Sequence, residues 1–86
     1  MVIGKVVSRL VSTRKYDTLQ GYKLLVVEPF YGKDKQPFVA ADQLGAGEGE
    51  FVLVSFGHNI QYALDKEAPI DALIVGIVDE APSEVK

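Results

Sequence analysis

The apolar residues of this 86-residue chain fall into short runs that glycine, proline and charged residues interrupt. The runs cover residues 2–12, 22–30, 37–41, 51–56 and 70–80, and Val, Ile, Leu, Tyr and Phe dominate them. Short runs rich in β-branched and aromatic residues predict strands, and a chain of this length forms one compact domain. The pattern therefore predicts a mostly β protein. A small five-stranded OB-like β-barrel is the best candidate, because closure leaves no exposed sheet edge.

One short helix is predicted between the last two strands. Residues 58–67 (HNIQYALDKE) have helical spacing, and Pro69 ends the segment. Asn59 is expected to cap the first turn, because its side-chain oxygen can accept a hydrogen bond from a free backbone N–H. The face expected to meet the sheet carries Ile60, Ala63 and Leu64.

The first predicted strand has two unequal faces. Gly4 and Val6 belong to the face expected to meet the core, whereas Lys5 and Arg9 make the other face mixed and partly solvated. Gly4 is expected to mark a kink, because glycine inside a strand often marks a bend.

Composition disfavours several classes of protein. The chain has no cysteine, a formal charge of −3 and 48% hydrophobic residues. Without cysteine there is no disulfide and no thiolate metal site, and a reducing compartment is favoured. The negative charge argues against nucleic acid, and no run approaches the roughly 20 apolar residues of a membrane span. The hydrophobic surplus fits either a subunit interface or a well-filled core, and composition does not decide between the two.

A glycine-rich stretch at residues 42–50 (DQLGAGEGE) raises the question of a phosphate-binding loop. Such a loop needs a Lys and a Ser or Thr, and it leads into a helix. This stretch has neither residue and leads into an apolar run, while Glu48 and Glu50 would repel a phosphate. The sequence therefore predicts a shaped, ligand-free turn. Asp42 and Glu50 are expected to fix its geometry. The glycines are expected to adopt positive φ or to allow close backbone approach, with a tight backbone at Gly47.

The sequence predicts no catalytic or metal centre. His58 is the only histidine, and no spacing connects it with Ser55 and a carboxylate as in a catalytic triad. One histidine among scattered carboxylates is a weak basis for a metal site. We therefore expect no enzyme activity, no cofactor and no metal. A small hydrolase that uses Ser55 and His58 is the least favoured hypothesis.

Three stretches of the chain resemble the vertex-protein family of bacterial microcompartments, which occurs in ethanolamine- and propanediol-utilising organelles and in carboxysomes. They are residues 11–27 (VSTRKYDTLQGYKLLVV), 39–55 (VAADQLGAGEGEFVLVS) and 69–80 (PIDALIVGIVDE). The resemblance spans nearly the whole chain, and the glycine-rich stretch is its most specific part. One departure lies at Gln61, where many relatives carry an arginine.

The resemblance implies a structural shell protein in the bacterial cytoplasm. It implies an OB-like barrel that assembles as a homopentamer, caps the fivefold vertices of a polyhedral shell and packs against hexameric shell proteins. Neither nucleic acid nor membrane is an expected partner. Residues 1–81 are expected to form the single vertex-protein domain and residues 82–86 a short tail. The candidate oligomer-interface or family-motif residues are Ser12, Thr13, Lys15, Asp42, Gly45, Ala46, Gly47, Gly49 and Glu50.

The alternative hypothesis is an OB-type binding module for single-stranded nucleic acid or a small ligand. It rests on the predicted fold alone. Such modules combine exposed aromatic rings with a basic groove. The rings available are Tyr16, Tyr22, Phe30 and Tyr31, but the acidic balance of the chain opposes phosphates.

Overall fold

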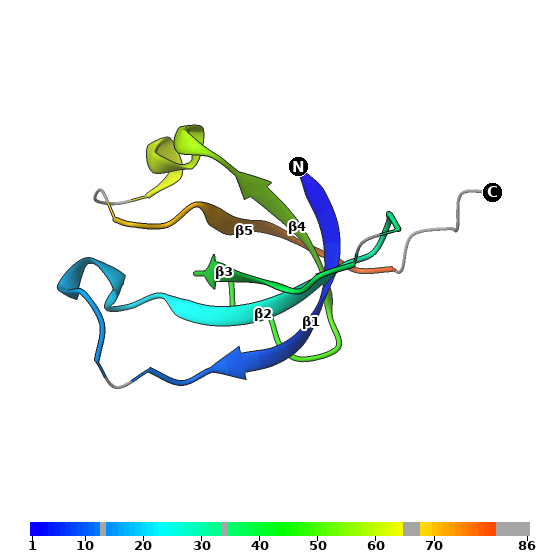
Figure 1. Cartoon of the computed structure of the whole chain (residues 1–86), viewed down its shortest axis with the longest axis horizontal. Helices are drawn as coiled ribbons and strands as arrows, with labels where there is room; N and C mark the ends of the chain where they lie inside the picture. The colour runs from blue at the N-terminus through cyan, green and yellow to red at the C-terminus, as the bar shows by residue number, and fades with distance from the viewer. Residues whose placement is uncertain (13, 34, 65–67, 81–86) are drawn as a thin grey trace.

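The chain folds into a closed five-stranded β-barrel, shown in Figure 1. The computed structural model describes residues 1–12, 14–33, 35–64 and 68–80. The strands are β1 (Val2–Leu10), β2 (Lys23–Pro29), β3 (Phe38–Asp42), β4 (Phe51–Phe56) and β5 (Ala72–Val78). Two 3-10 helices, η1 (Asp17–Leu19) and η2 (His58–Ala63), lie between strands. The prediction of a mostly β, five-stranded barrel is confirmed.

The strand order around the barrel is β1-β2-β3-β5-β4, and β1 closes the barrel by pairing with both β2 and β4. Four of the pairings are antiparallel. The fifth, between β3 and β5, is parallel, and its register consists of Ala41 opposite Leu73. A single register pair makes the β3–β5 contact the least hydrogen-bonded seam of the barrel.

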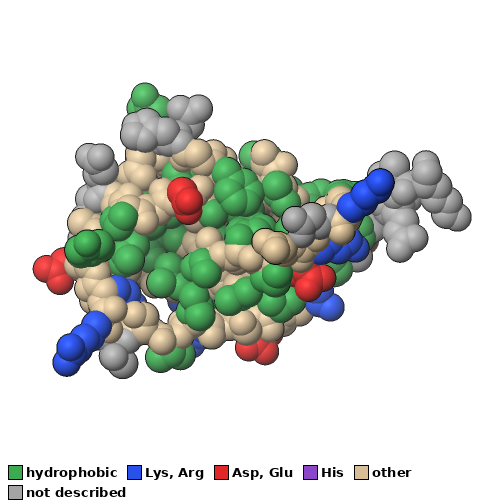
Figure 2. Space-filling model, in the orientation of Figure 1, with side chains coloured by type: hydrophobic (Ala, Val, Ile, Leu, Met, Phe, Trp, Pro, Cys, Tyr) green, Lys and Arg blue, Asp and Glu red, His purple; other side chains and the backbone are tan. Residues whose placement is uncertain are grey.

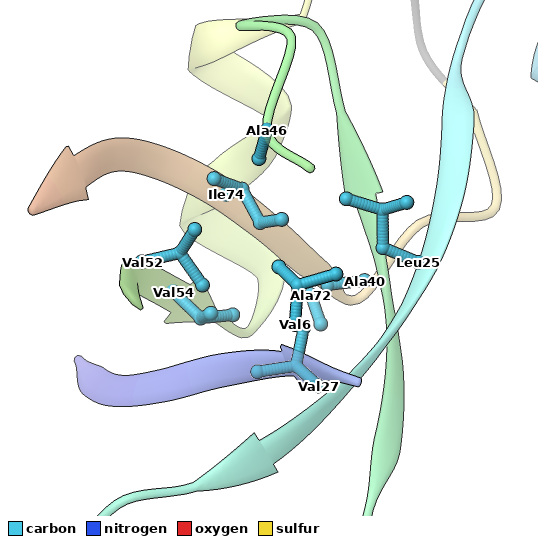
Figure 3. Close-up of a cluster of buried hydrophobic side chains, with 9 residues drawn as sticks. All are labelled: Val6, Leu25, Val27, Ala40, Ala46, Val52, Val54, Ala72 and Ile74. Atoms are coloured by element: carbon cyan, nitrogen blue, oxygen red, sulfur yellow. The ribbon is translucent and has the colours of Figure 1, made fainter. Parts of the chain in front are cut away.

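The interior of the barrel is filled by aliphatic side chains from every strand, as Figure 3 shows. Alternation explains the selection, because inward positions recur every second residue along a strand. The cluster consists of Val6, Leu25, Val27, Ala40, Ala46, Val52, Val54, Ala72 and Ile74. Ala46 is the one member that comes from a loop rather than a strand, so the glycine-rich stretch contributes directly to the core.

A second buried cluster lies on the outer side of the β3–β5 seam. Ala41 and Leu73 alternate with the inward-facing Ala40 and Ala72, so they point to the opposite face of the sheet. The 3-10 helix η2 and the segment before β5 cover them. The cluster consists of Tyr22, Ala41, Ile60, Ala68, Ile70 and Leu73. The outer face of the β3–β5 seam is therefore covered in part by connecting segments of the same chain.

The two faces of β1 follow the prediction near its start: Gly4 and Val6 are buried, and Lys5 and Arg9 are exposed. Gly4 has a different role from the expected kink. A Cβ atom built there would lie 2.9 Å from the carbonyl oxygen of Glu28 and would also clash with Val27. Glycine is needed here because β2 packs tightly against β1, whereas the register irregularity of the β1–β2 pair lies further on, between Val6 and Ser8.

The predicted short helix lies between β4 and β5, but it is a 3-10 helix rather than an amphipathic α-helix. It begins after Gly57, which has φ of 94°, so the expected capping position at Asn59 is wrong. Ile60 is buried as expected, whereas Ala63 is exposed and Leu64 lies beyond the helix. Six residues are too few for a stable α-helix. The segment instead forms a 3-10 helix, and its buried residue Ile60 attaches it to the sheet.

Neither of the 3-10 helices in the described ranges is long and apolar enough to cross a membrane. The predicted tail, residues 82–86, and residue 81 before it lie outside the described residues. The division into residues 1–81 and 82–86 stays a prediction.

Candidate functional site

The loop of residues 42–50, between β3 and β4, is organised around the carboxylate of Asp42. This side chain is buried, with 1% of its surface exposed. Its Oδ1 atom accepts a hydrogen bond from the Leu44 N–H at 2.9 Å. Its Oδ2 atom accepts from Gly45 N–H at 3.1 Å and from Ala46 N–H at 2.8 Å. Three successive backbone donors therefore converge on one internal anion.

This arrangement gives a physical argument against phosphate binding at this loop. Successive backbone N–H groups that point into one concavity are the usual donors of a phosphate-binding loop. Here the Asp42 carboxylate already occupies those donors and carries the negative charge that a phosphate would bring. The loop binds its own carboxylate in place of a ligand, which agrees with the predicted shaped turn.

The second half of the loop is joined to β1. Glu50 Oε1 accepts a hydrogen bond from the Gly47 N–H at 2.7 Å, which closes the turn internally. The Gly49 N–H donates to the Val6 carbonyl at 2.8 Å, and the Val6 N–H donates to the Glu50 carbonyl at 2.9 Å. These two bonds continue the β1–β4 ladder beyond the last paired residues of β4. Asp42 and Glu50 thus hold the two halves of the loop.

Lys23 also holds this loop, and the sequence analysis did not assign it that role. Its Nζ atom donates to the Ala46 carbonyl at 2.9 Å. Lys23 stands opposite Asp42 in the β2–β3 register, so strand pairing brings its side chain to the loop. Lys23 and Ala46 are 23 positions apart in the sequence, so no local pattern predicts this contact.

Two glycines of the loop, Gly45 and Gly49, have positive φ, at 89° and 87°. Gly47 has neither a positive φ nor a close backbone neighbour, so the tight backbone expected there is wrong. A Cβ atom built on Gly47 would meet only Glu50 Oε1, at an ordinary 3.5 Å. Gly49 is the third residue of the turn that the Glu50 N–H closes by donating to the Gly47 carbonyl at 3.1 Å, a position at which a positive φ favours glycine.

Of the other candidate residues, Ser12 and Lys15 lie in a separate loop between β1 and η1. The Ser12 hydroxyl donates to the Arg14 carbonyl at 2.8 Å, a local contact within that loop. Lys15 is half-buried, and Thr13 lies outside the described residues. The structure thus brings together the residues of the 42–50 loop and leaves the Ser12–Lys15 group apart from them. Their interface role stays a prediction.

Gln61 holds η2 against the segment that leads into β5. Its Nε2 atom donates to the Ala68 carbonyl at 2.9 Å and to the Ile70 carbonyl at 3.2 Å. Its Oε1 atom accepts from the Ala68 N–H at 3.2 Å. A neutral amide can both donate and accept, which a guanidinium cannot. Gln61 therefore makes an uncharged clamp inside this chain.

Metal and catalytic chemistry find no support within the described residues. They contain no group of three or more His, Asp or Glu side chains placed to hold a metal ion. No buried side-chain nitrogen or oxygen among them lacks a hydrogen-bond partner. Ser55 is half-buried on β4, and the His58 side chain is not among those described.

The chain is thus a small closed barrel in which the motif residues Asp42 and Glu50 accept hydrogen bonds from backbone N–H groups. Residues 1–79 match the family described as "Ethanolamine utilisation protein EutN/carboxysome". The bacterial microcompartment shell vertex protein GrpN of Rhodospirillum rubrum (strain F11) is 45% identical, over 92% of this chain and 93% of GrpN. The carboxysome shell vertex protein CcmL of Thermosynechococcus vestitus is 42% identical, over 92% of this chain and 84% of CcmL.

A solved structure gives the same result for the fold. It is described as the GrpN pentameric microcompartment shell protein from Rhodospirillum rubrum. It superposes with a TM-score of 0.82 at 41% identity, over 98% of this chain and all of that one. The chain therefore belongs to the EutN/CcmL family, whose relatives named above are shell vertex proteins of bacterial microcompartments.

Proposed function

We propose that this chain is a structural, non-enzymatic shell protein that assembles as a homopentamer and caps the vertices of a bacterial microcompartment. In this role it lies in the shell, within the bacterial cytoplasm, and packs against hexameric shell proteins. The observation that carries the proposal is the near full-length similarity to relatives named shell vertex proteins and to a structure described as pentameric.

Two features of the single chain support assembly. Large hydrophobic side chains are exposed at several positions, Val11 at 83% and Tyr16 at 75% among them. An 86-residue domain buries only about 60–65% of its unfolded surface and gains stability from a partner. Asp42 and Glu50 of the 42–50 loop, by contrast, accept hydrogen bonds from backbone N–H groups of their own chain and so stabilise the barrel itself.

Symmetry supports a ring over a two-fold dimer. A ring uses a heterologous contact, in which one patch of each copy meets a different patch of the next. Flat layers of sixfold units need fivefold units where the layer closes on itself. A pentamer of this barrel would supply such a closure point.

Native mass spectrometry of the purified full chain tests the assembly, and we expect a pentamer at micromolar concentration. A monomer at that concentration would overturn the proposal, and a hexamer would overturn the fivefold geometry. Co-expression with the hexameric shell proteins of the same host tests the vertex role. We expect closed polyhedral shells with the chain and open or irregular assemblies without it, as seen by electron microscopy; equal closure in both samples would contradict the role.

One observation favours ligand binding as a second candidate function. A cleft of about 440 Å³ lies at the β1, β2 and β4 ends, with Lys5 and Lys35 on its walls. Phe30 is in edge-on contact with Tyr31 and Phe51, with ring centroids 4.9 and 5.6 Å apart. A gel-shift series with single-stranded DNA at low salt tests this function. Binding that falls as salt rises would support it, and no shift at any salt concentration would exclude single-stranded DNA as its ligand.

A further inference from the structure

An apolar groove lies on the outer side of the β3–β5 seam. It has a volume of about 180 Å³, and its walls include Leu19, Leu24, Val39, Pro69, Ile70 and Asp71. Figure 2 shows hydrophobic side chains gathered over the part of this face formed by β2, β3 and β5. We call this concavity the β3–β5 groove.

The groove has a defined size and charge. An apolar cavity of about 150 Å³ is large enough to hold a benzene ring, so this groove accommodates a single aliphatic or aromatic side chain. Asp71 is the only charged residue among those that line it, and the exposed Asp17 lies two residues from the lining residue Leu19. The occupant that fits is therefore an apolar anchor with basic neighbours.

The same chain exposes such an element at the end of β1. Four exposed hydrophobic residues, which we call the β1 arm, lie along this stretch: Val7, Leu10, Val11 and Tyr16. Arg9 and Arg14 are exposed among them, and Lys15 is half-buried. An exposed apolar stretch flanked by cations complements a groove that is apolar with an acidic edge. Because the arm is exposed in the single chain, it does not fill the groove of its own copy.

We propose that the β1 arm of one copy docks in the β3–β5 groove of the next copy around the ring. The inference rests on the homopentamer proposed above and names its two contact patches. They differ in shape and charge, as a heterologous ring contact requires. Tyrosine and arginine side chains in well-packed, desolvated pockets commonly carry much of the energy of such contacts, and the arm region offers Tyr16, Arg9 and Arg14.

Cross-linking between singly substituted chains tests the pairing directly, because the natural chain has no cysteine. Val11→Cys and Val39→Cys chains are prepared separately, co-refolded and treated with a short bis-maleimide. We expect a dimer-sized band in denaturing gels only from the mixture. Tyr62→Cys, at a residue 90% exposed and outside both patches, replaces Val11→Cys in the control mixture and should give no such band.

The outcomes separate this inference from the function it rests on. Pentamers by native mass spectrometry without a cross-link in the Val11/Val39 mixture would overturn the arm–groove contact and leave the ring standing. A cross-link from Val39→Cys to Leu44→Cys, the exposed residue of the 42–50 loop, in place of Val11→Cys would also overturn it. A monomeric natural chain would overturn the homopentamer itself.

Substitutions that introduce or reverse a charge give a second, independent test. Val11→Asp and Val39→Asp should each weaken assembly roughly thirty-fold or more, the loss typical of an interface hot spot, with an unchanged β-type circular dichroism spectrum. Asp71→Arg should weaken assembly by less, and Asp71→Arg combined with Arg14→Asp should recover part of the loss. Assembly that is unchanged in both Val variants would contradict the proposal.

Discussion

The 42–50 loop and the β1 arm carry most of the residues that the sequence singles out, but they use their chemical groups in opposite ways. In the loop, a carboxylate with 1% exposure gathers three backbone donors, and Ala46 enters the core. In the arm, Val11 and Tyr16 are largely exposed, and the hydrogen bond of the neighbouring Ser12 is local. The difference teaches that Asp42 and Ala46 of the loop stabilise the barrel of the single chain, whereas the arm leaves apolar side chains exposed.

Removing the Asp42 carboxylate should have the largest effect on stability, because the loop is organised around it. Asp42→Ala leaves the buried Ala46 N–H without an acceptor and should lower the free energy of unfolding by roughly 3–5 kcal/mol. The whole domain has only about 4–13 kcal/mol at typical values per residue. Urea unfolding followed by circular dichroism measures the change. Asp42→Asn keeps one acceptor oxygen and should lose about half as much; equal stability of Asp42→Ala and the natural chain would contradict the role.

The glycines of the loop should differ from one another in their effect on stability. Gly45→Ala and Gly49→Ala should each lower the free energy of unfolding by roughly 1–2 kcal/mol, because both positions have positive φ. Gly47→Ala should leave it unchanged or raise it by up to about 1 kcal/mol, since the new Cβ meets only an ordinary contact. Thermal unfolding of the three variants checks the order. A larger loss at Gly47 than at its neighbours would contradict the described backbone.

The contact between Lys23 and the loop should have a smaller effect. Lys23→Met removes the hydrogen bond to the Ala46 carbonyl and should lower the free energy of unfolding by about 1 kcal/mol. Lys15→Met is the matched control in the other loop and should change it by less than about 0.5 kcal/mol. Parallel urea titrations measure both. A larger loss of unfolding free energy in Lys15→Met than in Lys23→Met would contradict the role assigned to Lys23.

The arm should show the smallest effect on the folded chain. Val11→Ser removes a side chain that is 83% exposed, so the unfolding free energy at concentrations where the chain is monomeric should change by less than about 0.5 kcal/mol. The same variant should shift the concentration at which rings form, as analytical ultracentrifugation would measure. A large loss of monomer stability with unchanged assembly would reverse the comparison between the loop and the arm.

Local patterns were sufficient to predict the strands. β4 spans the residues expected for it, and the boundaries of the other strands differ from the prediction by only a few residues. The short helix was placed correctly but assigned the wrong type, because its shortness and its buried anchor Ile60 outweigh its helical spacing. Asp42 was expected to fix the loop geometry from its place beside glycines. Which donors it would bind could not be predicted, since that depends on the backbone path after β3.

By itself, the sequence determined the number and approximate extent of the strands, the role of Asp42 in shaping its loop and the resemblance to a family. Each of these depends on residue type and on neighbours within a few positions. Only the tertiary structure decided that Lys23 reaches Ala46, that Gly4 is needed by β2, and that Gln61 clamps η2 to the segment before β5. These contacts arise because strand pairing and barrel closure bring distant residues together, and no local pattern records the distances that result.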